Sequence, residues 1–267
     1  MFLNNHHSLL IRKMVTHFMP RQDNELGRAV RSALQFMRDS GYVIKGKIEV
    51  SVDPKLPFMG YSTQRQEGHI IVVAGAALKS GSIEGLLIHE MCHIYRTEKG
   101  HLSHNNQLVN HIGTQVIHEN ELDKDYQIKV IQQAVNHVQD LYADDLAFQV
   151  FRKAGAFTPE QAHSFFLDWI NDTPLEEKSS KDRWQNVGTM LNNCFAVSNL
   201  ARHKIPDISN QVENAAQRFL SKVNERMRSE FSYFGDFMTN LTEDITREQF
   251  EKDLTEYLTR ITLLAKQ

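Results

Sequence analysis

The sequence predicts an α+β fold, in which a small twisted mixed sheet packs on one helix and a mostly helical C-terminal half follows. Two observations carry this prediction. Strand-like runs of alternating or β-branched residues are confined to residues 46–75. Apolar residues at three- and four-residue spacing, typical of amphipathic helices, precede these runs and dominate the chain after them.

Five segments before residue 97 have a clear pattern. Residues 24–39 place apolar side chains on one face of a helix. Residues 47–53 alternate apolar and polar, which predicts a strand with one buried face. Residues 60–65 predict a more polar strand, and the nearly continuous apolar run 69–74 predicts a deeply buried one. Residues 83–96 then form the next predicted helix.

The later part of the chain is predicted to be helical with polar interruptions. Residues 98–122 are polar, and we expect their four histidines to be solvated loop residues: His101, His104, His111 and His118. Residues 124–153 have a helical pattern, and Thr158-Pro159-Glu160 predicts the cap and first turn of another helix. Further breaks are expected near 171–181 and 202–208.

Length and charge limit the classes of protein to be considered. With 267 residues, the chain can form a core domain at 21–155 and a helical C-terminal subdomain at 156–267. Thirty basic and thirty-three acidic residues give a net charge of -3, which indicates no general attraction to nucleic acid or anionic membranes. The longest apolar run, 70–78, is far shorter than the ~20 residues of a membrane span, and residues 1–14 lack a secretory signal pattern. We expect a soluble, cytoplasmic protein.

The helix predicted at 83–96 contains two histidines with the spacing of metal ligands. His89 and His93 are four residues apart, which places both imidazoles on one face. Two neutral imidazole nitrogens can then reach one ion at ~2.0–2.1 Å. Glu90 lies about 100° around the helix, where it can accept a proton from a water held by the metal.

The residues that flank this pattern favour a metal site over a chance occurrence of the pattern. Apart from His89, Glu90 and His93, residues 86–95 carry only the weak acids Cys92 and Tyr95 as titratable groups. Three polar groups in an apolar helix are costly unless they meet a partner, and a metal supplies one. The alternative is a buried helix whose histidines hydrogen-bond to the backbone.

The segment LLIHEMCHIY, residues 86–95, resembles the active helix of zincin metallopeptidases. The resemblance covers roughly residues 46–150, since in those families this helix follows a small twisted sheet. It implies a zinc peptidase in which His89 and His93 bind Zn²⁺ and Glu90 is the general base. It also implies that the edge strand, residues 60–65 here, pairs with an extended substrate.

The third zinc ligand is expected from a later helix. Lys99 stands six positions after His93, where the metzincins have a third histidine. The gluzincins, including minimal and membrane-associated ones, instead use Glu-x-x-x-Asp, in which the second acid hydrogen-bonds the first histidine. Asp140 and Asp144 have this spacing, with aspartate in place of the glutamate. The resemblance therefore implies Asp140 as ligand and Asp144 as the acid that orients His89.

An alternative third ligand is Glu119, with Asp123 as its partner, and the pair Glu121 and Asp125 in the same cluster has the same spacing. That cluster lies where a helix is expected to begin, and acids there are favoured by the helix dipole alone. His137, one turn before Asp140, is a further substitute ligand. Asp145 is expected to be a surface or capping acid.

The sequence thus predicts a cytoplasmic zinc metalloprotease, a hydrolase that acts on a peptide or protein, with no nucleic-acid or membrane partner. Zinc held by His89, His93 and Asp140 would activate a water, and Glu90 would transfer its proton to the leaving amine. Two alternatives stay open. One is a zincin-like binding or regulatory module with weak or no peptidase activity, and the other is a metal-dependent amidohydrolase acting on a small molecule.

Overall fold

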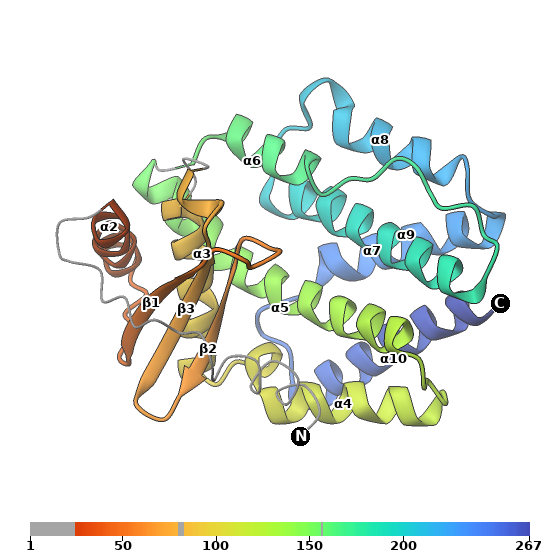
Figure 1. Ribbon diagram of the computed structural model, residues 1–267, viewed down its shortest axis with the longest axis horizontal. Helices are drawn as coiled ribbons and strands as arrows, with labels where there is room; N and C mark the ends of the chain where they lie inside the picture. The colour runs from red at the N-terminus through yellow and green to blue at the C-terminus, as the bar shows by residue number, and fades with distance from the viewer. Residues whose placement is uncertain (1–24, 80–82, 156) are drawn as a thin grey trace. The chain divides into compact units, whose positions relative to one another are not determined.

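The computed structural model describes residues 25–79, 83–155 and 157–267, and it confirms the predicted α+β class. A three-stranded mixed sheet and its helices precede a mostly helical remainder (Figure 1). Residues 1–14, in which the sequence has no secretory signal pattern, lie outside the described residues. None of the described helices combines the length and apolar character that a membrane span requires.

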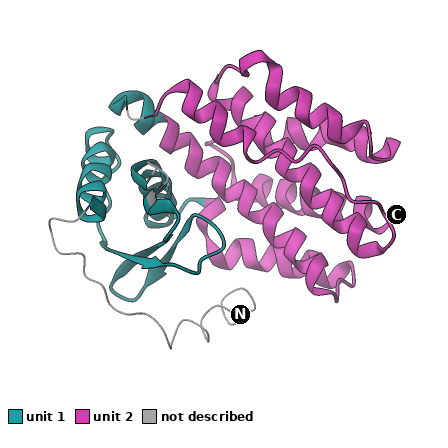
Figure 2. Cartoon of the chain, turned by 45° about the horizontal axis from the view of Figure 1, so that its top comes forward, with its two compact units in different colours: residues 1–101, 149–156 teal, residues 102–148, 157–267 magenta. Residues whose placement is uncertain are grey.

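Contacts divide the chain into two compact units (Figure 2). The sheet unit comprises residues 1–101 and 149–156, and the helical unit comprises residues 102–148 and 157–267. This division does not follow the boundary expected at residue 155, so the domains 21–155 and 156–267 stay a prediction.

The sheet consists of β1 (Lys47–Asp53), β2 (Gly60–Arg65) and β3 (Gly68–Ala74) in the order β1-β3-β2. β3 pairs in parallel with β1 and antiparallel with β2. The most apolar strand is therefore the central one, as its nearly continuous apolar run predicts. Gly68 has a φ of +145°, and a Cβ there would lie 2.3 Å from the carbonyl oxygen of Lys47, so only glycine permits this pairing.

Two helices complete most of the sheet unit. α2 (Glu25–Asp39) packs on α3 (Ile83–Glu98), and α3 packs on β2 and β3. α2 buries Ala33 and Met37, and the Cys92 thiol of α3 lies 3.8 Å from the Met37 sulfur. α3 therefore has the sheet on one side and α2 on another, and these contacts fix the helix that carries the two histidines.

The helical unit is built around α7. Its elements are η2 (Leu102–His104), α4 (Asn106–Glu119), α5 (Asp125–Ala154), α6 (Pro159–Leu167), α7 (Ser180–His203), η3 (Ile208–Asn210), α8 (Gln211–Leu220), α9 (Glu225–Asn240) and α10 (Arg247–Lys266). α7 packs against α6, α8, α9 and α10 and buries Trp184, Met190 and Phe195 completely or nearly so. α5 extends through both units, because its residues from Gln149 onward belong to the sheet unit.

α4 corrects the loop expected at residues 98–122. Asn105 caps it, since its side chain accepts a hydrogen bond from the Leu108 backbone N–H. Its buried face is apolar and consists of Leu108, Val109, Ile112 and Val116. His111 and His118 are exposed as expected but on a helix, whereas His104 is buried, with its Nδ1 2.7 Å from the Ser103 hydroxyl.

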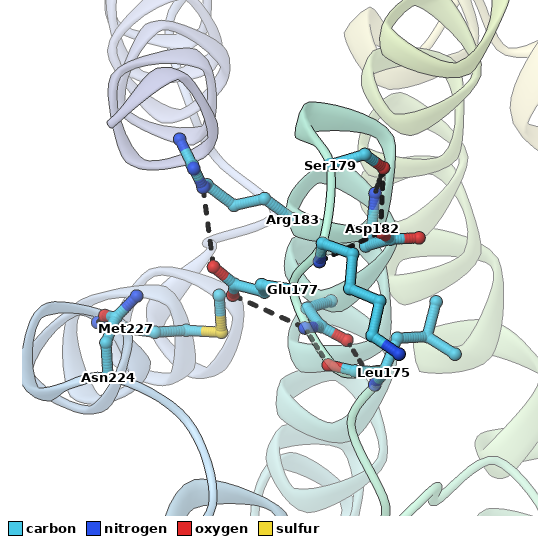
Figure 3. Close-up of polar contacts among 9 residues, drawn as sticks. Leu175, Glu177, Ser179, Asp182, Arg183, Asn224 and Met227 are labelled. Atoms are coloured by element: carbon cyan, nitrogen blue, oxygen red, sulfur yellow. Dashed lines mark hydrogen bonds and ion pairs between the residues drawn. The ribbon is translucent and has the colours of Figure 1, made fainter.

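Polar side chains anchor the extended segment that precedes α7, where the break near 171–181 was expected (Figure 3). The Ser179 side chain caps the helix by accepting from the Asp182 backbone N–H. Asn186 bonds both backbone groups of Leu175, at 2.8 and 2.9 Å. The Thr158 cap is confirmed as well, as a capping box at the start of α6.

Candidate metal centre

α3 separates its apolar and polar side chains around its axis. Leu87, Ile88, Met91 and Cys92 are fully buried in the sheet unit. His89 and His93 occupy a half-buried face one turn apart, as the four-residue spacing predicts. This arrangement leaves both imidazoles partly accessible on a helix whose other side is fully buried.

The two imidazoles face each other through the same type of nitrogen. The Nε2 atoms of His89 and His93 are 3.0 Å apart, and the ring planes meet at 78°. Two nitrogens bound to one tetrahedral zinc ion lie about 3.3 Å apart, so the pair is close to the separation that an ion requires. Converging nitrogen lone pairs repel unless one carries a proton or a cation lies between them.

Among the described residues, Asp140 joins this pair in a potential metal-binding group. His89, His93 and Asp140 each offer one ligand atom, and these atoms all lie within 4.8 Å of one another. The alternative ligand Glu119 is not in the group. It is exposed at the end of α4 and accepts a hydrogen bond from Gln115 Nε2 at 2.8 Å.

Glu90 is a buried carboxylate beside the histidine pair. Its residue is only 5 % exposed, and it makes no hydrogen bond or ion pair to another described residue. A buried acid without a protein partner is costly to maintain for stability alone.

The acids that follow Asp140 on α5 differ from each other in environment. Asp144, one turn further, is buried, and its predicted hydrogen bond to His89 stays a prediction. Asp145 is not the surface or capping acid that was expected. Its carboxylate forms two hydrogen bonds with the Arg202 guanidinium, at 2.6 and 2.7 Å, and is only 19 % exposed.

The His137 side chain forms a hydrogen bond within the helical unit. Its Nε2 lies 3.0 Å from Asn192 Oδ1, and because an amide oxygen can only accept, Nε2 is the donor. Burial lowers the pKa of His137 to about 4, against the opposing effects of Asp140 and of this hydrogen bond. The ring is therefore neutral at physiological pH and stacks on Phe195 with its centroid 4.9 Å away. This hydrogen bond leaves Nδ1 as the ring nitrogen with a lone pair, and Nδ1 has no hydrogen-bond partner among the described residues.

The helical unit also has a groove of about 850 Å³ between α4, α9 and α10. Its lining mixes acids and bases, among them Glu248, Glu256, Arg226 and Lys252. None of the three residues of the metal-binding group lines it. Ligand chemistry, rather than cavity size, therefore identifies the candidate centre.

Comparison with known families assigns the chain to a family but does not assign it an activity. Residues 32–262 match the model of a family of unknown function, DUF5781. This match covers most of the chain, and the protein belongs to that family. No curated protein and no solved structure matches the chain. His89, Glu90, His93 and Asp140 all lie within the matched range.

Proposed function

We propose that this protein is a zinc-dependent peptidase, in which His89, His93 and Asp140 hold the metal and Glu90 is the general base. The observation that carries the proposal is the 3.0 Å approach of two histidine Nε2 atoms within reach of a carboxylate. Two imidazoles and one carboxylate form a donor set typical of catalytic zinc, which keeps one further position for water.

A zinc ion bound there would lower the pKa of a water and polarise the carbonyl of a peptide. Glu90 takes up the proton that the attacking water loses and delivers it to the nitrogen of the leaving amine. Its low exposure supports this role, since a residue that is only 5 % exposed has little bulk water near it to compete for its oxygens. Asp144 is proposed to orient His89 by accepting its remaining N–H.

β2 is proposed to align the substrate. In the sheet formed by the described residues it is an edge strand, hydrogen-bonded to β3 on one side, and it packs on α3, the helix that carries the histidine pair. An extended peptide can add to such an edge through backbone hydrogen bonds, independently of its sequence. We also propose a cytoplasmic location, because Cys92 and Cys194 are both buried free thiols, as a reducing compartment permits.

The proposal is tested by Glu90→Gln, with Glu84→Gln in the first turn of the same helix as the matched control. Glu90→Gln keeps the carboxylate's shape but cannot take up a proton. We expect it to retain the fold and one zinc per chain while cleavage of an unfolded protein falls by a factor of about 10²–10⁴. Full activity in Glu90→Gln, or a wild-type chain that takes up no zinc, would overturn the proposal.

The same measurements separate the peptidase from its alternatives. Aspartate at position 140 is one methylene shorter than the gluzincin glutamate, which favours a binding or regulatory module as the second candidate. That candidate predicts stoichiometric zinc and no cleavage of proteins or small amides by the wild-type chain. Cleavage of small amides alone would instead indicate an amidohydrolase.

A further inference from the structure

Asp140 lies on α5 between two polar attachments of that helix to α7. Before it, Gln133 and His137 both donate to Asn192 Oδ1, at 2.7 and 3.0 Å. After it, Asp145 pairs with Arg202. Both attachments lie within the helical unit, as does Asp140 itself.

The Arg202 attachment has the geometry of a rigid support. Nε and Nη2 bond the two oxygens of Asp145, and Nη1 donates to the carbonyl oxygens of Met238 and Thr239 at the end of α9, at 3.4 and 3.0 Å. The Arg202 side chain is only 10 % exposed. A bidentate pair between planar groups fixes orientation as well as distance.

The Asn192 attachment is equally specific. Gln133 Nε2 donates to both Asn192 Oδ1 and the Gly188 carbonyl oxygen, the latter at 3.1 Å, so one α5 side chain bridges two positions one turn apart on α7. His137 adds a third hydrogen bond to this attachment through its Nε2. Burial lowers the pKa of the ring to about 4, so at any pH well above 4 the ring is neutral and keeps its proton on Nε2. The register of α5 against α7 is therefore set on both sides of Asp140.

We propose that Asn192 and Arg202 of α7 are positioning residues, which hold the α5 backbone where the short side chain of Asp140 reaches the metal. This inference rests on the proposed function, because it assigns these residues a role at the same site. A metal ligand must be held within about 0.5 Å of its productive position. An aspartate has one methylene less than a glutamate with which to compensate for a displaced backbone, so its supports matter more.

Stability alone gives a weak reason for these polar contacts. A buried ion pair can often be replaced by apolar residues with little loss of stability, because desolvation offsets the attraction between the charges. Arg202 and Asn192, if they fix the orientation of a ligand, are instead comparable to the residues that hydrogen-bond to metal ligands in known sites. Loss of such residues weakens metal binding about 10- to 100-fold.

The experiment compares Arg202→Met with Arg260→Met. Arg260 is the matched control, since it pairs with Glu230 and stacks on the Tyr233 ring, 3.7 Å from its centroid, and both of these partners belong to α9. Zinc affinity is measured by competition with a chromophoric chelator, and the ligand geometry is measured by the visible absorption spectrum of the Co²⁺-loaded chain. Asn192→Leu serves as a second variant of similar volume, in case Arg202→Met fails to fold.

We expect Arg202→Met and Asn192→Leu to bind zinc at least 10-fold more weakly and to change the cobalt spectrum, whereas Arg260→Met matches the wild type. Wild-type affinity and spectrum in the folded Arg202→Met and Asn192→Leu chains would overturn the inference while leaving the proposed function standing. If Arg260→Met weakened zinc binding as much as Arg202→Met and Asn192→Leu do, the inference would also be overturned and the proposed function would stand. A wild-type chain without zinc affinity would overturn both.

Discussion

Glu98 joins the end of α3 to the segment that leads into β1. Its carboxylate accepts from the backbone N–H groups of Lys45 and Gly46, at 2.8 and 2.7 Å, and lies 3.0 Å from His69 Nε2. A Cβ at residue 46 would be 2.9 Å from the Glu98 oxygen, so a larger residue there would displace this carboxylate. Burial raises the pKa of Glu98, but these three partners outweigh it and hold the pKa below its ordinary value.

The lowered pKa gives a pH-dependent prediction. An acid whose pKa is depressed by folding stabilises the protein above its unfolded pKa, and that contribution is lost as pH falls through the folded value. We expect Glu98→Gln to reduce the free energy of unfolding by about 1–3 kcal/mol at pH 7. The difference from wild type should shrink as the pH falls below the ordinary glutamate range.

Urea unfolding at several pH values measures this effect. Glu67→Gln, an exposed acid in the turn between β2 and β3, is the control and should change stability by less than about 0.5 kcal/mol. A Glu98→Gln deficit that stays constant down to pH 3 would contradict the prediction.

At the scale of elements, local pattern predicted the sheet well and α4 poorly. The strands at 47–53 and 60–65 were predicted with the bounds observed, because side-chain alternation and turn residues are local signals. α4 was missed because Leu108, Val109, Ile112 and Val116 form a narrow apolar stripe among polar residues and histidines. Packing on α10 and η2 turns that stripe into a buried face.

The buried face of α4 is tested by truncating one side chain. Ile112 is 3 % exposed, so Ile112→Ala removes buried methyl groups and leaves a cavity. We expect a loss of about 2–5 kcal/mol in the free energy of unfolding. Thr114→Ala on the exposed face of the same helix should be within about 0.5 kcal/mol of wild type. Equal effects of the two changes would show that α4 is not packed in solution.

The end of α7 offers a stabilising substitution. Lys204 caps the helix with a φ of +54°, in the left-handed region that disfavours a side chain. We expect Lys204→Gly to raise the free energy of unfolding by about 0.5–1 kcal/mol, because glycine adopts this conformation without steric cost. Ala201→Gly, in the last turn of the same helix, should lower it by up to about 1 kcal/mol. Thermal unfolding of both variants measures the contrast, and destabilisation by Lys204→Gly would refute it.

At the scale of the whole molecule, the candidate site divides into a local and a long-range part. His89 and His93 could be paired from the sequence because one helix fixes their relation. Asp140 was preferred over Glu119 from the sequence, but Glu119 stayed open as the alternative, because a ligand from another helix depends on how that helix packs. Arg202 and Asn192 carried no sequence signal, since neither stands at a recognisable spacing from Asp140.

Metal binding should be visible in the stability of the whole chain. A ligand that binds only the folded state adds about 2.7 kcal/mol at a concentration 100 times its Kd. We therefore expect zinc to raise the Tm of wild type and Glu119→Ala alike, and a chelator to reverse the rise. Asp140→Ala should show a much smaller rise. An equal rise in Asp140→Ala, measured by differential scanning calorimetry, would exclude Asp140 as a ligand.

The strand order β1-β3-β2 also bears on the order in which the strands pair during folding. β2 and β3 are joined by a short turn, and such a hairpin closes in about 1–10 μs. Among the described strands β1 pairs with β3 alone, and this pairing joins segments that are farther apart in the chain than the two strands of the hairpin. We expect the parallel pairing of β1 to be the later event, so substitutions in β1 should speed unfolding more than they slow folding.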